Sequence, residues 1–179
     1  MRKIVIAGFP GVGKSTAATI DPQIVADMES SNFHWIIDPE GKKHVHPAWP
    51  DNYVKAIEMM ATETDGLKDY RDLLYICCST HKEVIERLIQ DKVPVIIVAP
   101  KDKQTYLNRY MARGSSEDFI KSMDENWDSY MKDIASYGMP VIYNDEYLHD
   151  ILFMPGTYDY LCDKVANTEQ YVFGQIWEE

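Results

Sequence analysis

Short apolar runs alternate along this chain with longer stretches in which apolar residues recur at helical spacing. This alternation predicts a parallel β-sheet whose strands are joined by helices, because a return to a parallel neighbour needs a crossover of a dozen or more residues. The expected strands are Lys3–Ala7, Gln23–Met28, Leu73–Cys78, Val93–Ala99 and Pro140–Tyr143. The expected helices are Ser15–Ile20, one that begins at Asn52, His81–Gln90, Lys103–Ala112, Glu117–Ser136, Glu146–Leu152 and Tyr158–Gln170.

The 179 residues suit one domain, so the expected fold is α/β with three layers, in which helices cover both faces of a five-stranded parallel sheet. Leu73–Cys78 is almost continuously apolar, which predicts a buried, central strand. The stretch from Glu29 to Asp51 is rich in proline and shows no regular pattern. A long irregular stretch in a compact domain usually carries function or covers a site.

Composition excludes several classes of protein. Asp and Glu number 29 against 18 Lys and Arg, and the resulting charge of −11 opposes a basic face that grips long nucleic acid. No apolar run reaches the roughly 18 residues of a membrane span, and Ile4–Ala7 is too short for a signal peptide. The three cysteines, with Cys77 and Cys78 adjacent, form neither a disulfide framework nor a zinc spacing, and His44 and His46 lack a third ligand. We therefore expect a cytoplasmic protein.

The first expected strand leads into residues 8–15, which fit the pattern G-x-x-x-x-G-K-[ST] of phosphate-binding loops. Glycines permit positive φ and leave no Cβ between backbone N–H groups and phosphate oxygens. Lys14 would supply charge to the β- and γ-phosphates, and the Ser15 hydroxyl would bind Mg²⁺. The alternative is a glycine-rich turn that fits by chance. The motif predicts ATP and Mg²⁺ as ligands, Lys14 as a catalytic residue, and nucleotide contacts from Gly8, Phe9, Pro10, Gly11, Val12, Gly13, Lys14, Ser15 and Thr16.

A carboxylate at the end of a strand is needed to hold Mg²⁺ beside such a loop. Leu73–Cys78 is followed by Ser79 rather than by an acid, so the candidates are Asp27 and Glu29. Alternation along the strand places these two acids on one side, and ligands of open parallel sheets bind beyond the carboxyl ends of the strands. We expect Asp27 to be catalytic and to hold the metal together with Ser15. Alternatively, both acids are solvated loop residues.

Further polar candidates follow the same strands. Ser79 and His81 lie where they can hydrogen-bond a second substrate; alternatively, Ser79 or Thr80 caps the next helix, with Glu83 completing the capping box. The aromatic and amide side chains of the irregular stretch suit stacking on a base and reading its edge, and alternatively they pack this stretch onto the core. The predicted substrate-binding residues are Asp27, Glu29, Ser30, Trp35, Tyr53, Ser79 and His81.

These residues together resemble the P-loop nucleotide kinases, the group of the adenylate, thymidylate and shikimate kinases. The likeness covers the strand–loop–helix start, the acid Asp27 and the segment Val95–Gly114. In that segment Arg109 and Arg113 resemble the arginines that clamp the transferring phosphate in the lid of such enzymes. More narrowly, most of the chain resembles a group of small kinase-like proteins predicted in phages and bacteria. The Asp-Gly-Phe-Pro-Arg signature of adenylate kinases is absent.

The resemblance implies one kinase-like domain over residues 1–179, with an acceptor-binding region at about 29–65 and a lid-like segment at about 109–118. It implies that Arg109 and Arg113 are catalytic; alternatively, they are surface arginines near Glu117 and Asp118. The expected activity is phosphoryl transfer from ATP to a small acceptor, foremost a nucleoside or deoxynucleoside monophosphate. The alternatives are a kinase for a hydroxyl-bearing metabolite and a nucleotide-binding switch or ATPase without an acceptor. The oligomeric state stays open.

Overall fold

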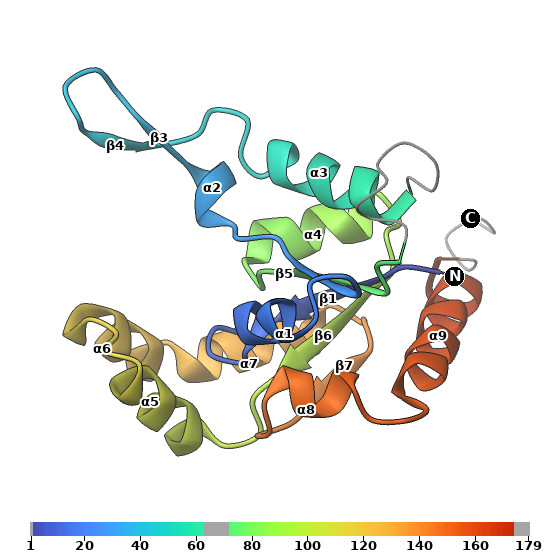
Figure 1. The fold of residues 1–179 in the computed structure, drawn as a ribbon. Helices are drawn as coiled ribbons and strands as arrows, with labels where there is room; N and C mark the ends of the chain where they lie inside the picture. The colour runs from blue at the N-terminus through green and yellow to red at the C-terminus, as the bar shows by residue number, and fades with distance from the viewer. Residues whose placement is uncertain (1, 63–71, 174–179) are drawn as a thin grey trace.

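A computed structural model describes residues 2–62 and 72–173 of the chain. Its main sheet has five parallel strands in the order β2-β5-β1-β6-β7 (Figure 1). The predicted α/β architecture with a five-stranded parallel sheet is therefore confirmed, and each expected strand is present. The strands are β1 (Ile4–Gly8), β2 (Val25–Asp27), β5 (Tyr75–Cys78), β6 (Val95–Ala99) and β7 (Val141–Tyr143).

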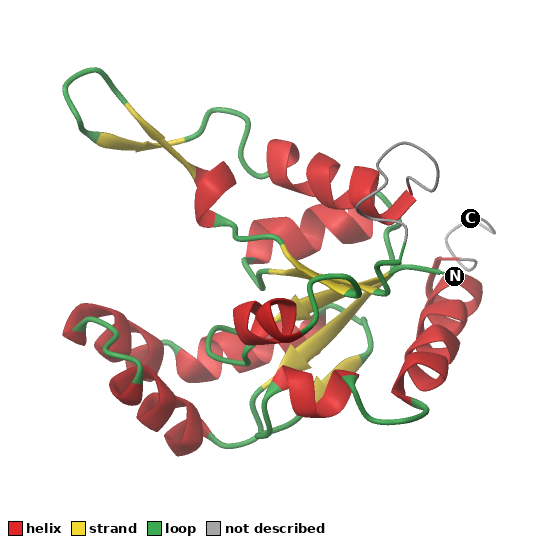
Figure 2. Ribbon diagram, viewed as in Figure 1, coloured by secondary structure: helices red, strands yellow, loops and turns green. Residues whose placement is uncertain are grey.

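Helices surround this sheet (Figure 2). One group contains α3, which packs beside α4 and contacts β1 and β5, and α7, which contacts β6. A second group contains α1 and α9, which both pack against α8, and α9 also contacts β1 and β6. The helices are α1 (Lys14–Ile20), α2 (Ser31–His34), α3 (Asp51–Thr62), α4 (Lys82–Gln90), α5 (Lys103–Ala112), α6 (Glu117–Glu125), α7 (Trp127–Ser136), α8 (Leu148–Leu152) and α9 (Thr157–Asn167), followed by a π-helical stretch, Thr168–Phe173.

The middle of the sheet is β1, which pairs with β5 on one side and β6 on the other. Every residue of these three strands is buried, because helices on both faces leave no solvated face for polar side chains. The sequence analysis placed Leu73–Cys78 at the centre, but β5 lies between β2 and β1, next to the edge of the sheet. The chain that leaves β1 therefore emerges in the middle of the carboxyl edge.

The stretch expected to be irregular contains a two-stranded antiparallel hairpin that projects from the domain (Figure 1), formed by β3 (Trp35–Ile37) and β4 (Lys43–Val45). Its turn is closed by Asp38, whose carboxylate accepts the backbone N–H of Lys42 at 2.7 Å, and by Gly41 at a φ of 80°. The strands are short and largely exposed, so no buried face left an alternating pattern in the sequence. A turn signal was nevertheless present in Asp38–Gly41.

The single helix expected over Glu117–Ser136 is two helices, α6 and α7, which meet at Asn126. The Asn126 side-chain amide donates to the carbonyl oxygen of Ser122 at 2.8 Å. Asparagine side chains that bond to a nearby backbone group compete with the helical ladder, which explains the break. The helical spacing of apolar residues continues from α6 into α7. It therefore predicted which side of both helices is buried, but it did not predict the break at Asn126.

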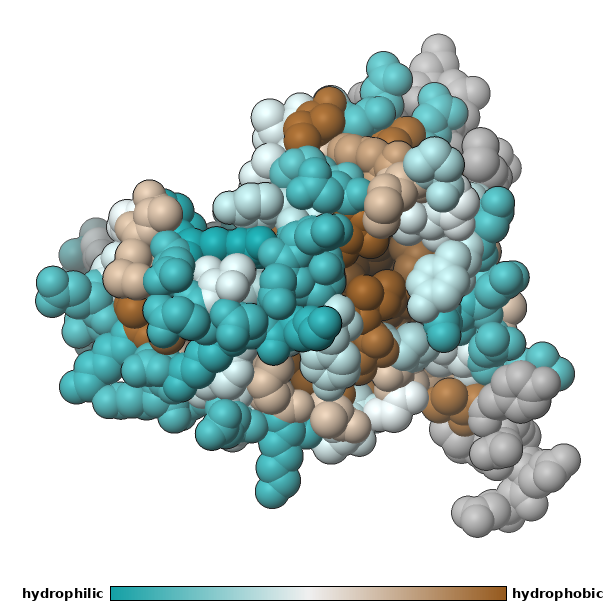
Figure 3. Space-filling view, turned by 90° about the horizontal axis from the view of Figure 1, so that it is seen from below, coloured by the Kyte–Doolittle hydropathy of each residue, from teal (hydrophilic) through white to brown (hydrophobic). Residues whose placement is uncertain are grey.

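Polar residues dominate one face of the molecule (Figure 3). The face seen in Figure 3 is mostly hydrophilic, with hydrophobic residues gathered in a hollow near its middle. No helix among the described residues is both long and apolar enough to span a bilayer.

Cys77 and Cys78 are buried free thiols on β5, and burial raises the pKa of Cys78 to about 12. These two cysteines are therefore small core residues, as expected.

The central position of β1 makes its interior side chains sensitive to truncation. We predict that Ile6→Ala lowers the free energy of unfolding by about 2–5 kcal/mol, because a fully buried isoleucine leaves a cavity when it is cut back. The control is Ile37→Ala on β3, where the side chain is 73% exposed and the change should stay within about 0.5 kcal/mol. Urea unfolding monitored by circular dichroism measures both. Equal losses for the two variants would contradict the assignment of β1 to the core.

Candidate functional site

An open cleft of about 860 Å³ lies at the carboxyl ends of β1, β2 and β5. The chain runs from β1 to β2 and β5 on one side of the sheet and then to β6 and β7 on the other, so β1 marks the point where the strand order reverses. Ligands of open α/β sheets bind at such points. The walls of the cleft come from residues 8–16, from the segments after β2 and β5, and from α5, α6 and α7.

The loop between β1 and α1 depends on glycine at three positions. Gly11 and Gly13 have φ angles of 82° and 98°, which side chains rarely permit. A Cβ on Gly11 would also lie 2.7 Å from the ring of Tyr110. A Cβ on Gly8 would meet the side-chain carbons of Lys14 at 2.9 Å. Glycine therefore lets the loop fold tightly around the lysine.

The loop is fastened to the core through its other residues. The buried ring of Phe9 contacts the rings of Trp127 and Tyr130 edge to face, with centroids 5.5 and 6.3 Å away. Tyr110 donates its hydroxyl to the carbonyl oxygen of Pro10 at 2.8 Å. Val12 was also expected to contact the nucleotide. It is fully buried and does not line the cleft, so it supports the loop from the core side instead.

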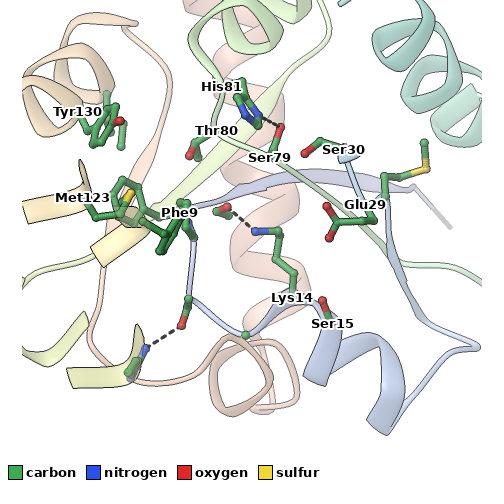
Figure 4. A pocket seen from close by; sticks show the side chains of 18 of the residues that line it. Phe9, Lys14, Ser15, Glu29, Ser30, Ser79, Thr80, His81, Met123 and Tyr130 are labelled. Atoms are coloured by element: carbon green, nitrogen blue, oxygen red, sulfur yellow. Dashed lines mark hydrogen bonds between the residues drawn. The ribbon is translucent and has the colours of Figure 1, made fainter. Parts of the chain in front are cut away.

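Lys14 occupies the centre of the cleft (Figure 4). Its ammonium group donates to the carbonyl oxygen of Gly8 at 2.7 Å. Figure 4 shows it between two unlike walls. One wall is polar and presents Ser15, Glu29 and Ser30; the other is largely apolar and presents Phe9, Met123 and Tyr130.

Ser15 and Asp27 meet as the sequence analysis expected. The Ser15 hydroxyl donates to Oδ2 of Asp27 at 2.5 Å, while Oδ1 of Asp27 is buried and has no partner. A hydroxyl and a carboxylate with spare acceptor capacity are the hard oxygen donors that suit Mg²⁺, which keeps several waters and needs few protein ligands. The two residues therefore fit a magnesium ion. No group of three or more His, Cys, Asp or Glu that could hold a metal occurs among the residues described.

Ser79 and His81 lie on the cleft, and neither Ser79 nor Thr80 caps α4 as the alternative interpretation expected. His81 itself is the residue that precedes α4, and the capping position makes no side-chain hydrogen bond. Its Nδ1 instead pairs with the Ser79 hydroxyl at 2.8 Å. The ring is open to the cleft, but loss of water beside Trp49 and His34 lowers the pKa of His81 below its ordinary value of 6.5. His81 is therefore a neutral imidazole at pH 7.

Trp35 and Tyr53, two of the predicted substrate contacts, do not line the cleft. The ring of His34 stacks between Trp35 and Trp49, with centroids 4.3 Å away on each side, and Trp49 stacks on Tyr53. Tyr53 is fully buried. The stack anchors the projecting hairpin, so the alternative in which these rings pack the stretch onto the core describes them better. Residues 63–65 of the expected acceptor region lie outside the described residues.

Arg109 lines the cleft from α5 and already has several partners. Its guanidinium lies over the rings of Tyr106 and Tyr147, 4.7 and 4.1 Å from their centroids. It also donates to the carbonyl oxygens of Gly11 and Asp145. Arg109 therefore joins the glycine-rich loop to the turn after β7.

Arg113, one helical turn further on, is more weakly held. Its Nε donates to the Ser115 hydroxyl at 2.7 Å, and its guanidinium lies 4.9 Å from the centroid of the Tyr110 ring. The alternative from the sequence was a surface arginine near Glu117 and Asp118. In the structure, Arg113 instead hydrogen-bonds to Ser115. The lid-like segment expected at about 109–118 thus comprises the end of α5 and the start of α6. Arg113 is the less firmly held of the two arginines, because its partners are one hydroxyl group and the ring faces of Tyr110 and Phe119.

Sequence reasoning missed the wall that α6 and α7 contribute. Met123, Tyr130, Asp133 and Tyr137 line the cleft opposite the segments that follow β2 and β5. Lys82 and Glu83, at the start of α4, were also missed. The helical period marks Met123 and Tyr130 as inward-facing, but periodicity does not reveal that the inward face borders a cavity. For Asp133, Lys82 and Glu83 no sequence signal was available.

The low pKa of His81 leads to a prediction about its neighbour. The Glu83 carboxylate raises the pKa of His81 and so works against the desolvation that lowers it. We predict that Glu83→Gln lowers the pKa of His81 further, because the imidazolium loses a nearby negative charge. Titration of the ring carbon protons by NMR measures the effect. Glu86→Gln, on the same helix and paired with Lys82, should leave the His81 titration unchanged, and a rise of the His81 pKa in Glu83→Gln would contradict the geometry.

Comparisons with known proteins add little to this picture. No protein-family model matches the sequence, and no curated protein matches it. Among solved structures, the chain is similar to the SH3-kinase fragment of tight junction protein 3 in its apo form. The TM-score is 0.46 and the sequence identity 14%, and the match covers 94% of this chain and 57% of that chain. The similarity is too low to bear on the function of the cleft.

Proposed function

We propose that this chain is a P-loop kinase that transfers the γ-phosphoryl group of ATP to a small acceptor held in the same cleft. The observation that carries the proposal is that one cleft is lined by a loop of the phosphate-binding pattern, by the side chain of Lys14 and by Ser15, whose hydroxyl is hydrogen-bonded to Asp27 just behind the lining. Such groups supply positioning and charge stabilisation, which are most of what phosphoryl transfer asks of a protein.

Lys14 is poised for the phosphates. Its present partner is the neutral carbonyl oxygen of Gly8, and an anionic phosphate oxygen would make a stronger hydrogen bond with the same ammonium group. The missing side chains at Gly11 and Gly13 leave room for the rings of Tyr110 and Tyr147, which pack close to the loop. At Lys14 itself, ATP binding requires only that the ammonium group exchange one acceptor for another.

Ser15 and Asp27 would hold the magnesium ion that accompanies ATP. The unpartnered Oδ1 of Asp27 supports this role, because a buried acceptor without a partner is costly unless a ligand satisfies it. When bound, the ion supplies charge neutralisation at the β- and γ-phosphate oxygens. Arg113 would leave Ser115 and donate its planar fork to the transferring group.

The charges of the cleft favour a hydroxyl acceptor over the monophosphate that the resemblance suggested. Lys14, Arg109 and Arg113 line the cleft from the loop, α1 and α5, whereas Glu29 and Glu83 line it from the segment after β2 and the start of α4. The remaining cation there is Lys82, whose ammonium lies within 3.9 Å of carboxylates of Glu86 and Asp133.

A dianionic phosphate beside Glu29 and Glu83 would meet two carboxylates, which is unfavourable in a partly desolvated site. A hydroxyl group needs a proton acceptor instead, and Glu29 and the neutral His81 line the cleft and can take that role. A nucleotide switch without an acceptor has less support, because it has no need of the polar pocket formed by Ser79, His81 and Glu29.

A panel of acceptors tests the proposal. ADP formation from ATP and Mg²⁺ is measured alone and with nucleoside monophosphates, nucleosides and hydroxyl-bearing metabolites in turn. Stimulation by a hydroxyl compound supports the acceptor class proposed here, and stimulation by a monophosphate supports the alternative. Equal hydrolysis in every well would indicate a switch or an ATPase.

We predict that Lys14→Ala lowers turnover at least about 10²-fold and leaves the melting temperature nearly unchanged, because the ammonium group faces the cleft and stabilises charge only when phosphate is bound. Lys55→Ala, an exposed position on α3, provides the matched control and should keep wild-type kinetics. A folded Lys14→Ala protein with wild-type turnover would overturn the role assigned to the loop.

The two arginines should respond differently to replacement by lysine. We predict that Arg113→Lys lowers kcat by about tenfold or more and changes the melting temperature little, because it loses the fork that grips phosphate while a lysine side chain still packs against the rings of Tyr110 and Phe119. Arg109→Lys should lower both kcat and the melting temperature, since Arg109 connects Gly11 to Asp145. Steady-state kinetics and thermal melts separate the two. Identical profiles for both variants would contradict the distinction.

A further inference from the structure

The hydrogen-bond ladder between β2 and β5 changes at its carboxyl end. The two strands are parallel and in register, with Asp27 opposite Cys77, and the N–H of Met28 donates to the carbonyl oxygen of Cys77 at 2.9 Å. In a parallel ladder the next bond would run from the N–H of Ser79 to the carbonyl oxygen of Met28.

A phenol hydroxyl takes the place of that bond. The N–H of Ser79 donates to the hydroxyl oxygen of Tyr53 at 3.2 Å, and the same hydroxyl donates to the carbonyl oxygen of Met28 at 2.5 Å. The hydroxyl thus stands between the two backbone groups that would otherwise pair with each other. Both groups keep a hydrogen bond, so the strands can separate without leaving a buried polar group unsatisfied.

The position of the hydroxyl is held by its ring. Tyr53 belongs to α3, its side chain is fully buried, and its ring centroid lies 5.4 Å from that of Trp49 and 5.1 Å from that of Phe33. Burial raises the pKa of Tyr53 far above its ordinary value, so the phenol keeps the proton that it donates. The buried ring, its stacking partners and α3 therefore hold the Tyr53 hydroxyl in one position between the ends of β2 and β5.

The cleft begins directly beyond this point. Glu29 and Ser30 continue from β2, Ser79 and His81 continue from β5, and all four line the cleft. We propose that Tyr53 is a positioning residue whose hydroxyl holds the ends of β2 and β5 apart and so keeps the acceptor side of the cleft open. The separation itself is independent of any ligand; the assignment of this side to an acceptor rests on the proposed function.

The variant Tyr53→Phe tests this inference, because it removes one oxygen atom and leaves the ring in place. We predict that its crystal structure shows the direct bond from the Ser79 N–H to the Met28 carbonyl oxygen, at about 2.9 Å, and a smaller cleft. The matched control is Tyr75→Phe on β5, which is equally buried and whose hydroxyl lies 3.4 Å from the carbonyl oxygen of Leu152. Tyr75→Phe should change neither the hydrogen bonds between the ends of β2 and β5 nor the size of the cleft. Strand ends that stay apart in Tyr53→Phe would overturn the proposal.

NMR of the wild-type protein gives a test that needs no variant. We expect a slowly exchanging Tyr53 hydroxyl proton close to the Ser79 amide, and no coupling across a hydrogen bond from that amide to the Met28 carbonyl carbon. Observation of that coupling would contradict the inserted hydroxyl.

Kinetics separate positioning from a general loss of stability. With the hydroxyl acceptor from the panel, Tyr53→Phe should raise the KM of the acceptor by about tenfold or more and keep the KM of ATP within about twofold. Equal changes in both constants would count against a role on the acceptor side. If the wild-type protein binds no MgATP, the proposed function fails, whereas the crystal structures and the NMR experiment still decide the role of the Tyr53 hydroxyl.

Discussion

The burial of β1 between two parallel neighbours is the constraint on which the rest of the structure depends. Strand pairing on both sides and helices on both faces leave β1 no freedom, so the chain that follows Gly8 always emerges at the middle of the carboxyl edge. Phe9 then continues the pairing by donating its N–H to the carbonyl oxygen of Val98 at 2.9 Å. Because Phe9 is also packed among aromatic rings, the glycine-rich loop is positioned by the core itself.

The distribution of charge in the cleft shows how an acidic protein can present a cationic site. Lys14, Arg109 and Arg113 all line the cleft although the chain carries a net charge of −11. Carbonyl oxygens and aromatic faces hold two of these cations without neutralising them, which carboxylates would do. Their charge therefore remains available to an anionic ligand.

Aromatic side chains connect the projecting hairpin with the strand ends. Trp35, His34, Trp49 and Tyr53 form one continuous stack, and Trp49 donates its indole N–H to the Glu83 carboxylate at 2.9 Å. These rings were expected to contact a base. None of these four rings lines the cleft; instead, Trp49 and Tyr53 hydrogen-bond to Glu83 and to the backbone of Ser79, which do line it.

The sequence alone determined the five strands, the glycine-rich loop and the meeting of Ser15 with Asp27. Each of these follows from local rules, because apolar runs mark buried strands, a spaced glycine motif marks the loop, and strand ends of one parallel sheet share an edge. Only the tertiary structure decided the order of the strands and the wall formed by α6 and α7. It alone also distinguished Arg109 from Arg113 and placed the Tyr53 hydroxyl between β2 and β5. These features depend on contacts between segments far apart in the chain, and such contacts leave no periodicity in the sequence that could reveal them.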